Sequence, residues 1–397
     1  MAKWLELVRG LRGIILLNSL LIGLSGAALF PVFGLFLVRE FGASPLQVGI
    51  FFTLNSIIGI GGSQLIGHLS DKGMNRRLLV QVANLASVLG CLLFAWATSY
   101  LQVLIIGAVI MLVSSVALPQ LFAIAGTVVK GDIAPLYQAA LRAMISVAWI
   151  AGPPLAFILA DLVGFRNLML IAAVSYAFAL LCALFLPGKA VLEQAKSTQI
   201  EVKSWLPWIL ALAFVFLFGA NNMYIVSMPI YLAEILGWSQ ALPGYLMGLA
   251  AALEIPIMLA AGITAHRIGH ARQMLFAALA GIVFYSLISF VAWQPIWFVA
   301  QIFNAILVGI GAGAGISYFQ TLMAPRMGAA SSLYNNAIKT GGLIGAALSG
   351  MIAQLFDYGM VFRVALVFCF IALLLFMVLA WLSSKPKVET QSSQAAG

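Results

Sequence analysis

Long runs of apolar residues, separated by short polar or charged stretches, extend along the chain from residue 11 to residue 383. A membrane-spanning helix needs ~20 predominantly apolar residues, and the runs are about that long or longer. Six runs precede a polar stretch at residues 188–205 and six follow it. The pattern therefore predicts an all-α membrane protein with twelve transmembrane helices, at residues 11–38, 45–69, 78–97, 101–128, 136–160, 165–187, 206–233, 241–265, 273–293, 296–322, 329–355 and 362–383.

The low content of charged residues excludes an ordinary water-soluble protein. Only 8% of the 397 residues are Asp, Glu, Lys or Arg, whereas 63% are hydrophobic. A soluble chain has ~25% charged residues. The basic N-terminus with its apolar run is similar to a secretion signal, but the run continues to Val38, which favours an uncleaved first helix. Cys91, Cys182 and Cys369 lie inside apolar runs, and their spacing suits neither a metal site nor a disulfide framework.

The distribution of the 20 Lys and Arg residues predicts the orientation of the helices. With both termini in the cytoplasm, fifteen of them lie on the cytoplasmic side and three, Arg39, Arg166 and Arg363, on the opposite side. The other two, Arg142 and Lys339, fall within predicted helices. Cytoplasmic loops are typically rich in Lys and Arg, so this bias favours a multi-pass protein with both termini in the cytoplasm. It also explains the net charge of +9 without a nucleic-acid partner.

The two halves of the chain resemble each other at a nearly constant offset. Residues 41–44 match residues 236–239 at an offset of 195, and residues 165–166 match residues 362–363 at an offset of 197. Each half has an even number of predicted helices, so both halves insert with the same orientation. The repeat predicts two parallel six-helix bundles, residues 1–187 and 206–383, with a cytoplasmic linker at 188–205 and a disordered cytoplasmic tail at 384–397. Halves of this kind place a substrate site between them near the middle of the membrane.

The loop after the second predicted helix carries a motif that resembles the loop motif of the major facilitator superfamily. The sequence departs from that motif at Met74, where a second glycine is expected, and at Asn75, where a basic residue is expected. The resemblance implies the major facilitator fold and a gating role for the loop. The residues that match the gating motif are Gly67, Asp71, Lys72, Arg76 and Arg77.

A closer resemblance is to the bacterial sugar efflux transporters within that superfamily. The stretches that carry it are residues 119–123, 148–157, 222–225, 246–248, 253–256 and 303–305. The resemblance implies export of sugars such as lactose, glucose or galactoside analogues across the bacterial inner membrane, in exchange for protons. It further implies a monomer in the lipid bilayer that moves its substrate by alternating access.

Three ionisable residues fall within predicted helices, where a charge is costly and usually functional. They are Arg142, Glu254 and Lys339. Because the fifth and eighth helices of the superfamily pack together, the resemblance implies an ion pair between Arg142 and Glu254. Two roles stay open for this pair: Glu254 gains a proton and releases Arg142 during the cycle, or the pair is a static bridge between the halves. Lys339 has no acidic neighbour in the sequence.

Uncharged polar side chains within the apolar runs form the candidate substrate site. Unpaired amides in lipid cost free energy, so they should face inward. Amides can bind sugar hydroxyl groups, and an indole offers a flat apolar surface to a sugar ring. Hydrogen bonding between helices is the alternative role. The candidate substrate-binding residues are Asn222, Asn304, Gln120, Asn221, Trp149, Tyr224, Asn335 and Gln138, with Gln301 and Asn55 as further amides.

Other functional classes find less support in the sequence. Residues 309–314 fit a dinucleotide-binding pattern, but they follow no predicted strand and lie in an apolar run. His266 and His270 have metal-like spacing but no further ligand nearby, so we expect neither a metal nor a cofactor. No hydrolase motif occurs, which argues against an enzyme. The remaining rivals are a drug exporter, which an acidic residue in the first helix would favour, and a membrane sugar sensor.

Overall fold

The structure is a computed structural model that describes residues 10–71, 73–130, 133–188, 205–324 and 326–384. The described part is helical, as the apolar runs predict, and contains no strand. The first group of helices comprises α2 (Leu11–Phe41), α3 (Pro45–Asp71), α4 (Arg76–Ala95), α5 (Tyr100–Ser114), α6 (Ala117–Val128) and α7 (Ala134–Ala183). The second comprises α8 (Leu206–Ile230) with the π-helix η2 (Tyr231–Ile235), α9 (Leu242–Ile268), α10 (His270–Phe290), α11 (Gln294–Leu322), α12 (Met327–Leu355) and α13 (Tyr358–Ser384).

Within the described ranges, 11 segments are long and apolar enough to cross a membrane. Helices α5 and α6 together form one such segment, Tyr100–Val128. Another lies in α7, which runs over 50 residues and contains a break at Gly164, where φ is 81° and ψ is 164°. This break falls in the predicted gap between residues 160 and 165.

The ends of α2 and η2 have the same local structure at positions that the repeat pairs. Gly42 and Gly237 follow these helices with φ of 60° and 64°, a conformation that glycine adopts without steric cost. The next residue donates its backbone N–H back to the helix in both cases, from Ala43 to the Leu37 carbonyl at 3.1 Å and from Trp238 to the Leu232 carbonyl at 2.9 Å. Such bonds satisfy carbonyls at a helix end. The matching sequences therefore form matching turns.

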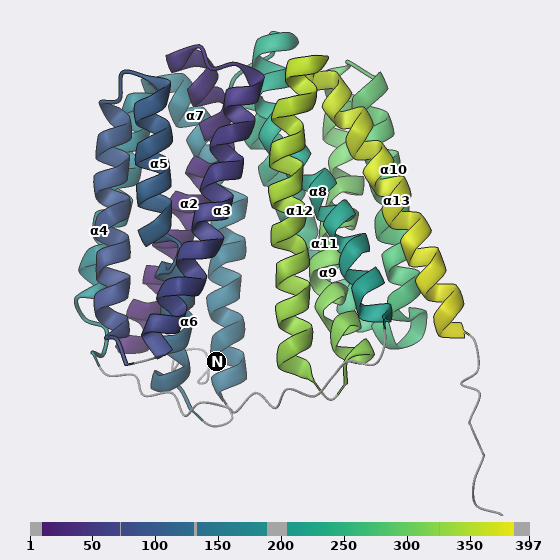
Figure 1. The fold of residues 1–397 in the computed structure, drawn as a ribbon, viewed down its shortest axis with the longest axis horizontal. Coiled ribbons are helices and arrows are strands. Elements are labelled where there is room, and N and C mark those ends of the chain that lie inside the picture. The colour runs from purple at the N-terminus through teal and green to yellow at the C-terminus, as the bar shows by residue number, and fades with distance from the viewer. Residues whose placement is uncertain (1–9, 72, 131–132, 189–204, 325, 385–397) are drawn as a thin grey trace, which may run out of the picture.

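Figure 1 shows two bundles side by side, which we call the N-half (α2–α7) and the C-half (α8–α13). The halves meet where α3 packs on α12, α7 on α9 and α2 on α8. The contacts of α3 with α12 and of α7 with α9 are close because glycine has no side chain at these positions. A Cβ added to Gly49 would lie 2.7 Å from the Gly350 Cα, and one added to Gly244 would lie 2.8 Å from the Pro154 Cα. These residues lie toward the end of the molecule at which α2 and α8 terminate, which we call the far end.

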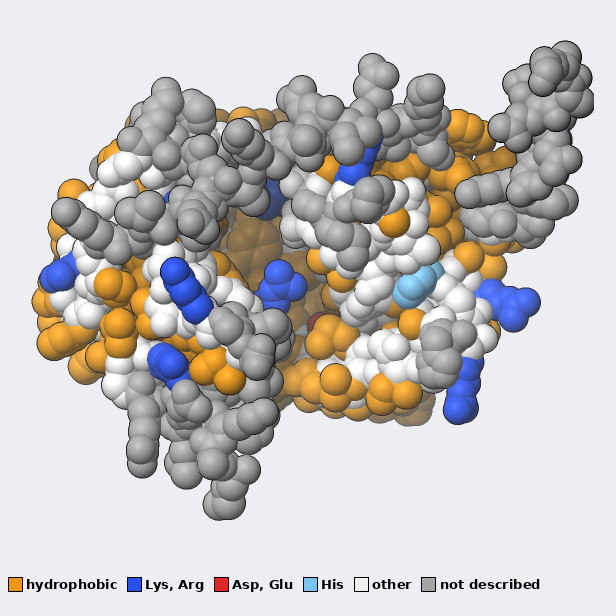
Figure 2. All heavy atoms as spheres, turned by 90° about the horizontal axis from the view of Figure 1, so that it is seen from below, with side chains coloured by type: hydrophobic (Ala, Val, Ile, Leu, Met, Phe, Trp, Pro, Cys, Tyr) orange, Lys and Arg blue, Asp and Glu red, His pale blue; other side chains and the backbone are white. Residues whose placement is uncertain are grey.

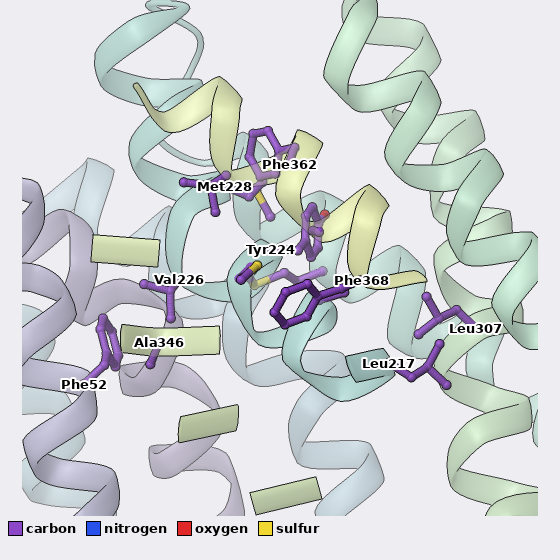
Figure 3. Packing of buried hydrophobic residues seen from close by; sticks show 14 of the residues in the cluster. Phe52, Leu217, Tyr224, Val226, Met228, Leu307, Ala346, Phe362 and Phe368 are labelled. Atoms are coloured by element: carbon purple, nitrogen blue, oxygen red, sulfur yellow. The ribbon is translucent and has the colours of Figure 1, made fainter. Parts of the chain in front are cut away.

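Apolar side chains fill both halves and also cover the outside. One buried cluster joins the halves, and Figure 3 shows Phe52 of α3, Val226 of α8 and Ala346 of α12 within it. Large apolar side chains such as Leu93, Leu259 and Leu374 are more than half exposed. Exposed apolar surface on this scale is typical of a lipid-facing protein.

The two ends of the molecule differ in how the halves meet. At the far end, Arg39 of α2 donates a hydrogen bond from Nε to the Glu234 carboxylate of η2 at 2.6 Å and a second bond to the Gln240 side-chain oxygen. At the near end, where α2 begins, Figure 2 shows a hollow between the halves with a hydrophobic floor and basic side chains near its mouth. The halves are therefore joined at the far end and separated at the near end.

Candidate functional site

A cavity of about 230 Å³ lies between the two halves. It is smaller than the ~300–1,000 Å³ typical of sites for drug-sized ligands, so it suits a small solute. Its wall combines one aromatic ring from the N-half with amides, a hydroxyl, a carboxyl group and apolar side chains from the C-half. The lining residues are Trp149 of α7, Asn221, Tyr224 and Ile225 of α8, Met247, Ala250, Ala251 and Glu254 of α9, and Asn304 and Val308 of α11.

Helices α8 and α11 contribute a hydrogen-bonded group to this wall. The Tyr224 hydroxyl donates to Gln301 Oε1 at 3.3 Å, and Asn304 Nδ2 donates to the same oxygen at 3.1 Å. Gln301 Nε2 donates to the Trp297 backbone carbonyl one turn earlier, at 3.0 Å. Gln301 is 0% exposed and does not line the cavity, whereas Tyr224 and Asn304 do. The group is thus anchored in the C-half and presents two of its members to the cavity.

Two further polar side chains line the cavity without a partner in the described part of the chain. Neither Asn221 nor Glu254 makes a side-chain hydrogen bond or ion pair with another described residue. Glu254 lies midway along α9 and is partly buried. Because a carboxyl group in an apolar helix is costly to desolvate, an unpaired one in a cavity is available to a solute or a proton.

Arg142 and Glu254 do not meet in this conformation, although both residues lie within the described part of the chain. Glu254 lines the cavity, whereas Arg142 is exposed. Lys339 of α12, in the opposite half, is also exposed. The predicted ion pair is therefore absent here and stays a prediction for another conformation.

The structure places the remaining predicted amides outside the cavity. Asn222 lies against α12, with Nδ2 about 3.5 Å from a Cβ built on Gly342. Gln120 accepts a hydrogen bond from the Ser70 hydroxyl at 2.8 Å, within the N-half. Gln138 donates to the Phe122 carbonyl at 3.4 Å, and Asn335 donates to the Ser331 carbonyl at 2.9 Å. These bonds link neighbouring helices or cap a turn of the same helix, which is the alternative role of such side chains.

The gating motif lies at the near end, between α3 and α4. Gly67 is in α3, but Lys72 and the side chain of Asp71 lie outside the described residues. The departure at Asn75 has a local explanation, because its side chain caps α4 by accepting hydrogen bonds from the backbone N–H groups of Arg77 and Leu78 at 3.0 and 3.4 Å. Arg76 is buried and Arg77 is partly buried.

Sequence reasoning missed two parts of this arrangement. The apolar side chains of the cavity, such as Met247 and Val308, carry no signal that separates them from lipid-facing residues. The far-end contact between Arg39 and Glu234 does carry a signal in the sequence, because the two positions are 195 residues apart, which is the offset of the repeat.

A second cavity, of about 150 Å³, lies within the N-half, and five phenylalanine rings are among its lining residues. It contains Asn55, whose Nδ2 donates to the Phe51 carbonyl at 2.7 Å. The candidate amide Asn55 therefore belongs to a separate, more apolar space than Asn304.

Comparison with known proteins gives matches over most of the chain. A sequence model of the Major Facilitator Superfamily matches residues 15–335 and 210–396. The chain is 36% identical over 375 residues to "Sugar efflux transporter A" of Escherichia coli (strain K12), with 93% of this chain and 96% of that protein covered. It is 37% identical over 362 residues to "Sugar efflux transporter B" of Salmonella typhimurium (strain LT2), with 89% and 91% covered.

Solved structures resemble the fold at low sequence identity. The nucleoside transporter NupG superimposes with a TM-score of 0.77 at 15% identity, covering 95% of this chain and 100% of that one. A bacterial homologue of the lysosomal transporter Spinster superimposes with a TM-score of 0.76 at 12% identity, covering 93% and 96%. The all-helical fold is therefore that of known membrane transporters.

Proposed function

The chain belongs to the Major Facilitator Superfamily, a family of membrane transporters, and on this basis we propose that it exports sugars across the bacterial inner membrane. The observation that carries the proposal is the cavity between the halves, in which the indole of Trp149 faces a wall with the amides of Asn221 and Asn304. The names of its relatives point to the same substrate class. An indole can cover the apolar face of a sugar ring while amides bind its hydroxyl groups.

The proposed membrane topology has twelve crossings in two six-helix repeats. A continuous helix of 50 residues would be ~75 Å long, more than twice the ~30 Å apolar core of a bilayer, so α7 is best divided at Gly164 into two crossings. Paired contacts support the repeat: the guanidinium of Arg166 lies 5.2 Å from the Trp96 ring, and that of Arg363 lies 5.8 Å from the Phe290 ring. With an even number of crossings, both termini lie in the cytoplasm, as the positive charges favour.

The proposed mechanism is alternating access by a monomer. The hollow at the near end and the contact of Arg39 with Glu234 at the far end support a conformation open to the cytoplasm. A sugar would enter this hollow, bind in the cavity and leave after the far end opens. We assign closure of the near end to the loop between α3 and α4, with Gly67, Asp71, Lys72, Arg76 and Arg77.

Proton exchange is proposed to act through Glu254. Its carboxyl group lines the cavity without a cation beside it in the described structure, and a proton offsets the cost of its burial. With the far end open, Arg142 would pair with Glu254 until a proton from outside binds Glu254 and releases Arg142. After the near end opens, entry of a sugar would displace that proton into the cytoplasm. This sequence couples inward proton movement to outward sugar movement and gives the predicted ion pair its place in the cycle.

The proposal is tested with inverted membrane vesicles, in which export appears as uptake. Labelled lactose, labelled glucose and a labelled lipophilic cation are supplied in turn, with and without a proton gradient. We expect uptake of at least one sugar that the gradient accelerates and that empty-vector vesicles lack. Uptake of the cation alone would overturn the sugar assignment, and sugar binding without uptake would favour a sensor.

A further inference from the structure

Gln301 lies directly behind the cavity wall and holds two of its polar residues. It is completely buried, and its side-chain oxygen accepts hydrogen bonds from both Tyr224 and Asn304. We propose that Gln301 is a positioning residue that fixes the direction of the hydrogen bonds at this wall, so that Asn304 and Tyr224 accept bonds from hydroxyl groups of the solute. The inference rests on the proposed function and names the feature of the sugar that this wall recognises.

The direction of each bond follows from the Trp297 carbonyl. That carbonyl can only accept, so the Gln301 atom 3.0 Å from it must be the amide nitrogen Nε2. The other end of the amide, Oε1, then faces Tyr224 and Asn304 and can only accept. Both of these residues must therefore donate to it, through the phenol hydroxyl and through Nδ2.

The atoms that remain for the solute are acceptors. With Nδ2 directed to Gln301, the free end of the Asn304 amide is Oδ1, and this atom is buried without a hydrogen-bond partner among the described residues. The Tyr224 hydroxyl has used its one proton and keeps only lone pairs. A buried acceptor without a donor is costly, so the wall favours a solute that supplies hydroxyl protons there. A sugar whose hydroxyl at that position is replaced by fluorine cannot supply one.

The experiment measures competition in proteoliposomes that contain the full chain. Uptake of labelled glucose is inhibited by unlabelled glucose and by its 2-, 3-, 4- and 6-deoxyfluoro analogues, and by lactose as a second sugar. For the wild type we expect one or two analogues to compete about tenfold or more weakly than glucose, and the others to compete nearly as well. The readout is the ratio between the concentration of the most weakly competing analogue and the concentration of glucose that give equal inhibition.

Gln301→Met removes both polar ends of the amide at similar volume. Asn304 is then free to turn either end to the solute, so the ratio should fall toward one, even where glucose itself binds more weakly. Gln301→Glu is the conservative variant: a protonated carboxyl group can donate to the Trp297 carbonyl and accept from Tyr224 and Asn304, so it should keep the ratio. Gln273→Met is the matched control, because Gln273 is equally buried and donates to the Ala261 carbonyl at 2.6 Å, away from the cavity.

Each outcome decides between the proposals. If Gln301→Met does not fold, Asn304→Leu removes the acceptor itself and should lower the ratio in the same way. A wild-type protein that transports glucose but treats all four analogues alike overturns this inference alone, as does Gln301→Met with an unchanged ratio. A wild-type protein that neither transports nor binds glucose or lactose overturns the proposed function together with it.

Discussion

At the scale of single residues, the site depends on which face of a helix a side chain occupies. Asn221 and Asn222 are neighbours in sequence, yet Asn221 lines the cavity and Asn222 packs against Gly342 of α12. Adjacent residues of a helix point about 100° apart, so only one of the two can face the passage. The sequence predicts both as substrate-binding residues, and separating Asn221 from Asn222 requires the positions of the neighbouring helices.

Glu254→Gln is expected to abolish the effect of a proton gradient on sugar export while leaving sugar exchange intact. Glutamine keeps the size of the side chain but cannot exchange a proton. The measurement is pH-driven counterflow in proteoliposomes, and Asp161→Asn is the matched control because Asp161 is an exposed acidic residue of α7 away from the cavity. Proton-dependent export that survives in Glu254→Gln would remove the carboxyl group from the coupling mechanism.

Trp149→Ala is expected to weaken sugar binding about tenfold, since aromatic packing contributes ~0.5–1.5 kcal/mol beyond the loss of buried area. Trp149→Phe should recover part of the affinity because it keeps a flat apolar ring. The quantity measured is the sugar concentration at half-maximal transport. Trp208→Ala serves as a control because Trp208 is 64% exposed on α8. Equal effects of the two alanine variants would mean that Trp149 acts only through stability.

At the scale of helices, the apolar runs predict the position of nearly every element, because a lipid-spanning helix must be apolar along its whole length. Local breaks are harder to predict. The run at residues 101–128 contains two helices, α5 and α6, which separate at Ser115 and Val116. Pro119 has no N–H to donate to the Ser115 carbonyl, and its ring crowds that carbonyl, which accounts for the break. Pro31 lies inside α2 without ending it, so a proline does not by itself predict where a helix breaks.

Gly49→Ala is expected to lower the thermal unfolding temperature in detergent. The added Cβ would lie 2.7 Å from the Gly350 Cα, so α3 and α12 must move apart, and overpacking of this kind costs ~1–3 kcal/mol. Gly61→Ala in the same helix has no atom within 4 Å of the new Cβ and should be neutral or slightly stabilising. A Gly61 variant as unstable as the Gly49 variant would contradict close contact between α3 and α12.

Glu234→Arg is expected to open the far end by placing two cations together. A cysteine introduced at Ala251, in the cavity wall, should then react faster with a membrane-impermeant thiol reagent added from the far side. The double variant Arg39→Glu with Glu234→Arg should restore slow labelling. Because both side chains are about one third exposed, the difference should shrink at high salt. Fast labelling in the double variant would show that charge pairing does not hold this end closed.

At the scale of the whole molecule, the sequence predicts the membrane class well, because it follows from composition and from the length of the apolar runs, whereas the six-helix repeat stays a prediction. The sequence does not predict the conformation. Whether Arg142 approaches Glu254 depends on how the halves are tilted, and that tilt is a property of contacts between them. The predicted pair stays a prediction for a different position of the same halves.

The twelve-crossing topology predicts that both termini lie on one side of the membrane. Fusions after Ser384 are expected to make green fluorescent protein fluorescent and alkaline phosphatase inactive, since the first folds in the cytoplasm and the second is active outside it. A matched fusion in the turn after Phe41, at the far end, should give the opposite result. An active phosphatase after Ser384 would place the C-terminal end outside and contradict the proposed topology.

The contact between Arg39 and Glu234 has a consequence for the origin of the protein. Under the proposed repeat these two residues are equivalent positions, and equivalent positions touch only on the symmetry axis that relates the halves. In a dimer of identical six-helix subunits, each such position faces its own copy, so opposite charges cannot meet there. A bond of this kind requires that the two repeated units differ in sequence at this position, as they can within one chain.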